Sequence, residues 1–266
     1  MSFWNIEGKH PISIQILKKL NFFLALTLST GLAISACSVE PSNEASQYLS
    51  QPISKDFKSI YATANQGSPH AQLQLGNMYE NGQGINKDKI KAAQWYKKAA
   101  EQGVADAQNN LAMLYYYNQV PKFDSDQSIA WFKKAAAQGQ PESQYHLGLV
   151  YEYGYGRQID YKQAVAWYQK SAAQGFTPAQ HNLGTLYLGE KGVDQYYDKA
   201  RKLYQKAADL GFSPAQHNLG VMYEKGEGVK QDYKKAAQWY QKAADQGNQE
   251  AQDRINEMIS EGKTTQ

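Results

Sequence analysis

The side chains best suited to acid–base or metal chemistry are three histidines in the second half of the chain. His181 and His217 lie 36 residues apart and hold the same place in two copies of a repeat. Packed helices lie about 8–10 Å apart, so these two rings cannot reach one zinc ion unless other ligands join them. His146 lies one residue further along its helix, and no cysteine or carboxylate stands at metal-ligand spacing from it. We therefore interpret all three as partly exposed residues of the repeat and predict no metal site.

Sequence motifs for other catalytic chemistry are absent from the printed chain. It holds no Gly-x-Ser-x-Gly and no candidate triad. Its glycine pairs, such as Gly82 with Gly84 and Gly154 with Gly156, resemble phosphate-binding loops superficially. They join two expected helices, however, and lack the Lys-Ser/Thr that follows such a loop. We predict a protein without catalytic residues or cofactors, and a hydrolase is the weakest of three functional hypotheses.

Cys37 is the one cysteine of the chain, which excludes a disulfide framework and a cysteine-rich metal site. The pair Lys18 and Lys19 precedes an apolar run from Leu20 to Ile34, and small residues follow it. This order of a basic segment, an apolar core and small residues is typical of a secretory signal. The run is short for a membrane-spanning helix, which needs about 20 residues. An uncleaved anchor helix is the alternative interpretation.

The tetrad Ile34-Ser35-Ala36-Cys37 resembles the lipobox of bacterial lipoproteins. The resemblance implies cleavage before Cys37 and lipidation of its thiol, and Ser38 implies sorting to the outer membrane. We expect a signal peptide over residues 1–36, then a flexible tether over 37–53, because that stretch is rich in Ser, Gln, Glu, Pro and Asn. The expected location is the cell envelope, as an outer-membrane lipoprotein that faces the periplasm or the cell surface.

Composition limits the remaining classes of function. The 266 residues include 28 Lys and Arg against 25 Asp and Glu, which gives a net charge of +3. This near balance argues against nucleic-acid binding, which needs a concentrated basic face. Hydrophobic residues make up 42% of the chain, which is a folded rather than a disordered composition.

A period of 36 residues runs through most of the chain. Glycine recurs at this interval from Gly67 to Gly247, and glutamine recurs from Gln72 to Gln252. Leucine, tyrosine and tryptophan follow the same interval, and Trp95, Trp131, Trp167 and Trp239 form one such series, which we expect in the core. Repetition at a fixed period of this length predicts a solenoid of stacked units.

Each repeat contains two amphipathic helical patterns. Asp88, Asp124, Asp160 and Asp232 share one phase and are expected to cap the second helices, while Thr177 and Ser213 are expected to cap first helices. We predict an all-α fold, a right-handed α-solenoid of five full repeats over residues 54–260 with one capping helix at each end. Residues 261–266 are expected to form a disordered tail.

The repeat pattern itself is Ala-x-x-x-Leu-Gly-x-x-Tyr-x-x-Gly-x-Gly, followed by Lys-Ala-x-x-Trp-Tyr-x-Lys-Ala-Ala-x-x-Gly. It resembles the Sel1-like repeat family, whose members are related to tetratricopeptide repeats. The copy from Ala215 to Gly247 matches nearly every marked position, whereas the second copy has Ala112 in place of Gly and lacks the glycine turn. The resemblance implies an adaptor scaffold for protein complexes, with a concave groove lined by the first helices.

The first helices carry one stripe that varies between repeats, and such a stripe can form a specific binding surface. The expected partner-binding residues of this groove are Asn110, Tyr116, Tyr117, Tyr145, His146, Tyr153, His181, Asn182, His217 and Asn218. Amides can hydrogen-bond a peptide backbone, and tyrosines are frequent anchors of interfaces.

We therefore predict a lipid-anchored scaffold that binds an envelope protein or peptide, does not bind nucleic acid, and has an oligomeric state that the sequence leaves open. A glycan-binding or peptidoglycan-associated module is the alternative. The lysines of the second helices, Lys98, Lys134, Lys170, Lys206 and Lys242, are interpreted as a solvated face rather than an anion track, because acids nearly balance bases overall.

Overall fold

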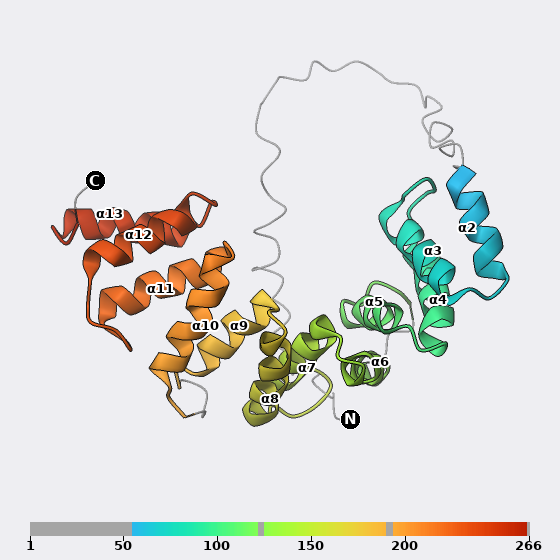
Figure 1. Cartoon of the computed structure of the whole chain (residues 1–266), viewed down its shortest axis with the longest axis horizontal. Coiled ribbons are helices and arrows are strands. Elements are labelled where there is room, and N and C mark those ends of the chain that lie inside the picture. Colours follow the sequence, from blue (N-terminus) through green and yellow to red (C-terminus); the bar gives the residue numbers. More distant parts are fainter. Residues whose placement is uncertain (1–54, 122–124, 190–193, 265–266) are drawn as a thin grey trace, which may run out of the picture. The chain divides into compact units, whose positions relative to one another are not determined.

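Twelve α-helices make up the part of the chain that the structure describes (Figure 1). This computed structural model describes residues 55–121, 125–189 and 194–264. The helices are α2 (Lys55–Asn65), α3 (Pro69–Asn81), α4 (Lys89–Glu101), α5 (Ala105–Tyr116), α6 (Ser125–Ala137), α7 (Pro141–Tyr153), α8 (Tyr161–Ala173), α9 (Thr177–Leu186), α10 (Tyr197–Asp209), α11 (Ser213–Lys225), α12 (Tyr233–Ala244) and α13 (Gln249–Ser260). Each helix packs against the next in sequence, so an all-α solenoid of five pairs, α3–α4 to α11–α12, lies between α2 and α13.

The N-terminal predictions fall on residues without a described structure. The expected signal peptide, Cys37 and the whole of the tether lie outside the described ranges and stay predictions. Within those ranges no helix combines the length and the apolar character that crossing a membrane requires. At the other end, residues 261–264 form a turn in which the Lys263 amide donates to the carbonyl of Met258, where the sequence predicted a disordered tail.

The ends of the helices confirm part of the predicted capping. Asp88, Asp160 and Asp232 each accept a hydrogen bond from a backbone N–H of the first turn that follows. The prediction for Thr177 and Ser213 is wrong, because Phe176 and Phe212 are the N-caps and neither makes a side-chain cap bond. Asp124 lies outside the described residues.

The repeated glutamines join successive repeats instead of closing capping boxes. Gln108 Nε2 donates to the carbonyl oxygen of Ala100, at 3.0 Å, in the last turn of the preceding helix. Gln138 Nε2, just after the second helix of the same pair, then donates to Gln108 Oε1 at 2.9 Å. Equivalent amide pairs join Gln102 to Gln72, Gln174 to Gln144 and Gln246 to Gln216. The bonds to carbonyls satisfy acceptors that a helix end leaves open and connect each repeat to the preceding one, whereas the amide pairs join the two helices of one repeat.

The core lies one residue beyond the tryptophan series. Tyr96, Phe132, Tyr168, Tyr204 and Tyr240 are almost completely buried, whereas Trp131, Trp167 and Trp239 are only partly buried. Each of the four tyrosines packs on a first-helix glycine, and a Cβ at Gly220 would lie 2.6 Å from the Tyr240 ring. The prediction that the tryptophan series forms the core is therefore wrong for three of the four residues. Trp95, which is 8% exposed, is the exception.

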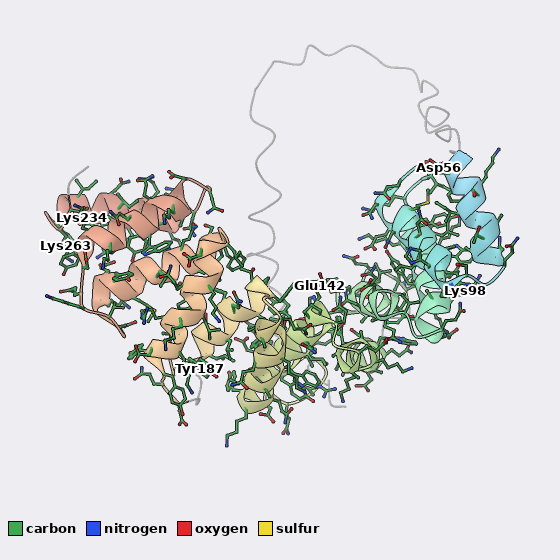
Figure 2. All side chains as sticks on the ribbon, in the orientation of Figure 1. Asp56, Lys98, Glu142, Tyr187, Lys234 and Lys263 are labelled. Carbon is green, nitrogen blue, oxygen red and sulfur yellow. The ribbon has the colours of Figure 1, made fainter. Side chains whose placement is uncertain are left out.

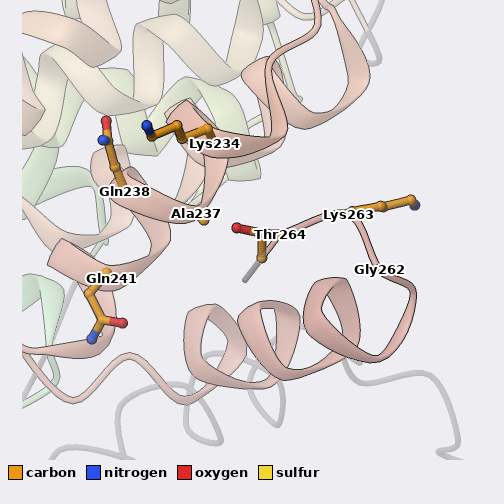
Figure 3. Close-up of a pocket in the computed structure, with 7 residues that line it drawn as sticks. All are labelled: Lys234, Ala237, Gln238, Gln241, Gly262, Lys263 and Thr264. Atoms are coloured by element: carbon orange, nitrogen blue, oxygen red, sulfur yellow. The ribbon is translucent and has the colours of Figure 1, made fainter. Parts of the chain in front are cut away.

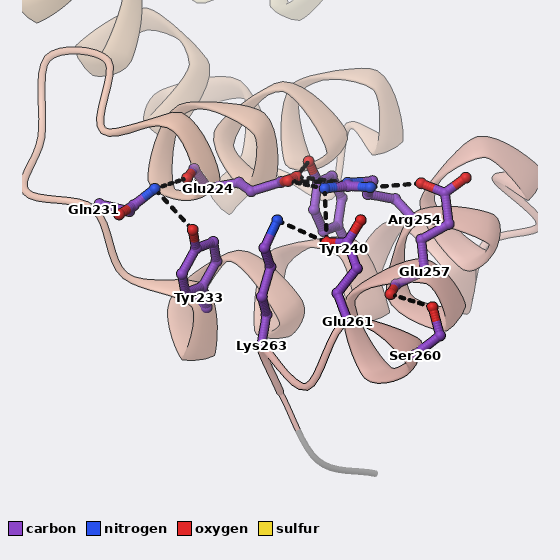
Figure 4. A network of polar contacts seen from close by, with 9 residues as sticks. All are labelled: Glu224, Gln231, Tyr233, Tyr240, Arg254, Glu257, Ser260, Glu261 and Lys263. Atoms are coloured by element: carbon purple, nitrogen blue, oxygen red, sulfur yellow. Dashed lines mark hydrogen bonds and ion pairs between the residues drawn. The ribbon is translucent and has the colours of Figure 1, made fainter.

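The last helix, α13, ends the array with a polar network (Figure 4). The Arg254 guanidinium donates to Glu224 on α11 and to Glu257 on its own helix, and Glu224 also accepts from the Tyr240 hydroxyl. The hydrogen bond from Arg254 lowers the pKa of Glu224. Asn256 is exposed, and it holds the repeat position at which Gly220 meets Tyr240.

Candidate functional site

Many polar side chains of the variable stripe on the first helices form hydrogen bonds with the buried tyrosine hydroxyls of the second helices. The Tyr96 hydroxyl lies 2.6 Å from Glu80 Oε2 and 2.7 Å from Asn77 Oδ1, and the Tyr168 hydroxyl donates to Glu152 Oε2 at 2.7 Å. Tyr204 pairs with Thr185 at 3.0 Å, and Tyr240 donates to Glu224 at 2.8 Å. A buried hydroxyl needs such a partner, since an unpaired one costs free energy. The stripe therefore varies partly because it must satisfy the core.

The predicted groove asparagines take part in these networks. Asn110 Nδ2 donates to Asn77 Oδ1 at 3.3 Å, and Asn182 Nδ2 donates to the Tyr168 hydroxyl at 3.2 Å. Both side chains are only partly buried, so each keeps some contact with solvent. They are positioned by the protein, which is the arrangement that a binding surface needs.

His181, Asn182 and Asn218 form a second group. His181 Nδ1 lies 3.1 Å from Asn182 Oδ1, and His181 Nε2 lies 3.1 Å from Asn218 Nδ2. Because the Asn218 amide donates, Nε2 is the acceptor and Nδ1 carries the proton. Burial lowers the pKa of His181, so the ring is neutral at pH 7. His217 stands apart from this group against the Tyr240 ring, and burial lowers its pKa as well.

The second repeat differs from the others and produces an aromatic cluster. Phe132 has no hydroxyl, and the first-helix position that carries Glu80, Glu152 and Glu224 elsewhere carries Tyr116 here. We use the term aromatic cluster for the rings that gather around this position: Tyr116, Tyr117, Phe132, Tyr145, His146 and Tyr155.

Ring contacts hold the cluster together across two repeats. The His146 ring stacks on Phe132 at 5.0 Å between centroids and lies 5.7 Å from Tyr116. Tyr116 lies 5.0 Å from Tyr117 and 4.5 Å from Tyr155, whose hydroxyl donates to the Tyr116 carbonyl. Tyr145 joins at 5.3 Å from His146. Offset and edge contacts of this kind stabilise such a group beyond its buried area.

The cluster is uncharged at neutral pH. Burial lowers the pKa of His146 to about 4, and its Nδ1 atom is buried without a hydrogen-bond partner. Burial also raises the pKa of Tyr145 to about 12 and raises that of Tyr116 further. A neutral histidine and neutral phenols in this setting are poor acid–base catalysts near pH 7. They form instead an apolar surface with a few hydrogen-bonding atoms.

Two exposed tyrosines border the cluster. Tyr117 and Tyr153 are each 40% exposed, and they follow the last turn of α5 and end α7 respectively. Tyr153 lies close enough to Tyr116 and Tyr145 to help raise the pKa of both. The structure thus brings together five predicted residues, which are Tyr116, Tyr117, Tyr145, His146 and Tyr153. His146 is 6% exposed and supports this surface from below, contrary to its interpretation as a partly exposed residue.

Phe132 and Tyr155 belong to the cluster and were not predicted as site residues. Phe132 could have been found from the sequence, because it replaces the tyrosine that the other four repeats carry at this position. Tyr155 gives no such signal, since it lies between Gly154 and Gly156 in a regular glycine turn of the third repeat. In the second repeat, Asn118 has a φ of 52° and replaces the missing glycine of that turn.

A pocket near the C-terminal end of the described residues is lined without catalytic groups. A pocket of about 580 Å³ lies beside α12 and the turn after α13, and Lys234, Gln238, Gln241, Lys263 and Thr264 line it with Ala237 and Gly262 (Figure 3). This lining contains no carboxylate and no histidine. Among the residues with a described position, no group of three or more His, Cys, Asp or Glu side chains could hold a metal ion.

The stacked helix pairs and the polar first-helix stripe define an α-solenoid repeat protein. The Sel1 repeat family matches residues 69–104, 105–140, 141–176, 177–212 and 213–248, and the chain belongs to this family. Sel1 repeat proteins are generally non-catalytic scaffolds for protein interactions. No curated protein matches the chain.

Three solved structures are similar to this fold. The c5321 protein, a protective antigen present in uropathogenic Escherichia coli strains, is 33% identical with a TM-score of 0.75 over 79% of this chain, which spans only 45% of c5321. A Sel1 repeat protein from Oxalobacter formigenes is 30% identical with a TM-score of 0.68, over 76% of this chain and 86% of that protein. A putative Sel1 repeat protein from Klebsiella pneumoniae is 23% identical with a TM-score of 0.50, over 76% and 99% of the two chains, and shows the fold alone.

Proposed function

We propose that this chain is a scaffold that binds a protein or peptide partner at the aromatic cluster of its second and third repeats. The observation that carries the proposal is the pair of exposed rings, Tyr117 and Tyr153, above a buried and uncharged aromatic base. Tyrosine gives a large contact area with little loss of side-chain entropy, and it is enriched where interfaces gain most of their binding energy.

Hydrogen-bonding groups near the cluster complete the proposed surface. Asn182 lies at the next repeat, bonded to Tyr168, and Tyr168 in turn lies 5.7 Å from the Tyr145 ring. Partly exposed amides and phenols can pair with the backbone of an extended peptide. The surface so assigned covers α5, α7 and α9, and the residues Asn110, His217 and Asn218 extend it toward the two ends.

The proposal includes the envelope location. The lipobox-like tetrad ending at Cys37 supports a lipid anchor on the outer membrane, with residues 38–53 as a tether to the solenoid. Labelled fatty acid fed to cells should appear on the chain and should be lost with Cys37→Ser. Full labelling of the Cys37→Ser variant would exclude Cys37 as the acylated residue.

Partner capture from solubilised envelope tests the binding surface. The bait is the full chain, beside a Tyr117→Ala/Tyr153→Ala variant and a control, Tyr61→Ala/Tyr196→Ala, which removes two other exposed tyrosines. We expect a protein that the wild type and the control retain and the variant loses, and that rebinds when purified. Equal capture by all three chains would place binding elsewhere. Retention of purified peptidoglycan instead of a protein would favour the glycan alternative.

A further inference from the structure

Charge is divided between the two helices of each pair. The second helices, α4, α6, α8, α10 and α12, carry 15 Lys and Arg against four Asp and Glu. The first helices, α3, α5, α7, α9 and α11, carry one Lys against five Asp and Glu. A solenoid places equivalent helices of successive repeats on the same side. The small net charge of the chain therefore conceals a strongly basic second-helix face.

The basic residues of this face follow a regular stripe. Lys91, Trp95 and Lys98 on α4 stand at i, i+4 and i+7, which is one face of a helix. The same spacing gives Lys235, Trp239 and Lys242 on α12, and α10 has Lys199 and Lys206 around a leucine. Figure 2 shows the side chains of these helices, with Lys98 labelled.

One lysine position of the stripe recurs in every repeat and forms no ion pair within the described residues. We name Lys98, Lys134, Lys170, Lys206 and Lys242 the lysine row; all five are exposed. Four of them lie over a tryptophan ring, with Nζ between 3.7 and 4.1 Å from the centroid. Within the described ranges, none of the five forms an ion pair with a carboxylate. The ammonium groups of these four are held over the rings, and all five remain open to an anion.

A pocket adds a focal point at the N-terminal end of this face. It has a volume of about 520 Å³, and its lining includes Lys91, Lys97 and Lys98 with one carboxylate, Glu101. Tyr61 of α2 also lines it and lies 5.9 Å from the Trp95 ring. The helix α2, which carries Tyr61, is the first described element after Cys37 in the sequence.

We propose that the second-helix face docks on an anionic phospholipid surface, with the lysine row and the α4 pocket against the headgroups. Lysine and tryptophan together are the side chains that membrane interfaces favour, whereas nucleic-acid binding does not call for indole rings beneath the cations. The inference gains from the proposed lipid anchor, because the 18 residue steps from Cys37 to Lys55 reach at most about 60 Å. A tether of that length keeps headgroups at high local concentration.

Vesicle binding tests this proposal without the lipid anchor. Every arm uses residues 38–266, so that neither an acyl chain on Cys37 nor the apolar run from Leu20 to Ile34 contributes and failure of the lipobox prediction cannot affect the result. One variant changes the lysine row to glutamine at all five positions. The control variant changes to glutamine five lysines outside the second helices, Lys58, Lys87, Lys225, Lys230 and Lys263, and so has the same net charge. Thermal unfolding checks that both variants fold.

We expect binding to vesicles of phosphatidylethanolamine with phosphatidylglycerol, and much weaker binding to phosphatidylcholine alone. The lysine-row variant should bind the anionic vesicles at least about tenfold more weakly, and high salt should release the wild type. Arginine at the same five positions should restore binding. Equal weakening by the control variant, absence of vesicle binding, or tighter row-dependent binding to duplex DNA or to soluble inorganic phosphate would each overturn the proposal.

Discussion

The second and third helix pairs have the same construction and opposite chemistry at one position. In the third pair, Tyr168 is buried on Gly148 and its hydroxyl donates to the buried carboxylate of Glu152. In the second pair, Phe132 is buried on a helix that carries Ala112, and Tyr116 holds the place of the glutamate. In the third pair, a buried tyrosine on the second helix is matched by a glutamate on the first helix. In the second pair, the buried ring has no hydroxyl, and a tyrosine takes the place of that glutamate.

The difference shows how a repeat protein can gain a local aromatic surface without losing its fold. Stacking depends on the glycine, the leucine and the buried ring, and those positions stay regular through the second repeat apart from Ala112. The polar partner of the ring is free to change once the hydroxyl is gone. Tyr116 then reaches Phe132, His146 and Tyr155, and the exposed Tyr117 and Tyr153 gather at the same place.

Removing the central ring should break the comparison most severely. Phe132→Ala is expected to lower the free energy of unfolding by about 3–5 kcal/mol, because it truncates a fully buried aromatic side chain. Denaturant unfolding measures this loss. Trp131→Ala is the matched control, and it should cost less because Trp131 is only partly buried. A larger loss for Trp131→Ala would mean that the core lies in the tryptophan series after all.

Acid should destabilise the cluster through His146. Its pKa is lowered from 6.5 to about 4 by burial, so between these values the unfolded chain binds a proton that the folded chain does not. Stability is therefore fully present above pH 6.5, falls as the pH drops toward 4 and changes no further below it. The loss reaches about 3 kcal/mol for this group.

The control for the acid effect is His146→Phe, which keeps a ring against Phe132 and does not titrate. His181 and His217 shift in the same direction and act in both chains. The difference between the two pH profiles of unfolding therefore reports His146 alone. Parallel profiles would show that His146 does not lose its charge on folding.

Removing the buried hydroxyl from the third repeat, or adding one to the second repeat, should lower the stability of the protein. Tyr168→Phe leaves the buried Glu152 without its phenol donor, and Phe132→Tyr places a hydroxyl beside Tyr116, where the second repeat has no glutamate. Each change is expected to cost about 1–3 kcal/mol of unfolding free energy. Phe132→Tyr combined with Tyr116→Glu should recover part of its loss, and a double-mutant cycle measures that coupling. Additive effects would contradict the link between the two positions.

Changes at the first-helix residue that faces the buried ring should have effects no larger than these. Gly148→Ala would bring a methyl group closer to the Tyr168 ring than atoms can approach, so we expect a loss of about 1–3 kcal/mol from overpacking. The reverse change in the second repeat, Ala112→Gly, should cost about 1 kcal/mol through helix flexibility. Thermal unfolding of both variants compares them, and a stabilised Gly148→Ala protein would show that the third pair has room to spare.

The fold could be predicted because its determinants recur. The interval of 36 residues, the capping aspartates and the glycine after each second helix each report the same architecture, and the structure confirms five pairs between two single helices. The burial of individual aromatics was harder to predict. Trp167 and Tyr168 are adjacent on one helix. Tyr168 is the core residue because its ring packs against Gly148 on the first helix, and the repeat period alone does not show which of the two rings makes that contact.

The site could be predicted only in part, for a related reason. A variable stripe identifies positions where the solenoid tolerates change, and five of the residues predicted from it, Tyr116, Tyr117, Tyr145, His146 and Tyr153, lie close together in the structure. It could not separate residues that face solvent from those that satisfy a buried phenol, as Asn182 does for Tyr168. The repeated lysines of the second helices were recognised from the sequence, but their excess over the acids of those helices was counted only once the helix bounds were known.

Asn256 has a consequence for how such a chain can evolve. A further second helix after α13 would need a small residue opposite its ring, and Asn256 fills that space with a polar side chain. Duplication of a repeat at this end would therefore produce a misfit, whereas duplication between α2 and α13 would insert one more regular unit. The two flanking helices let the array change its length from within while its ends stay closed.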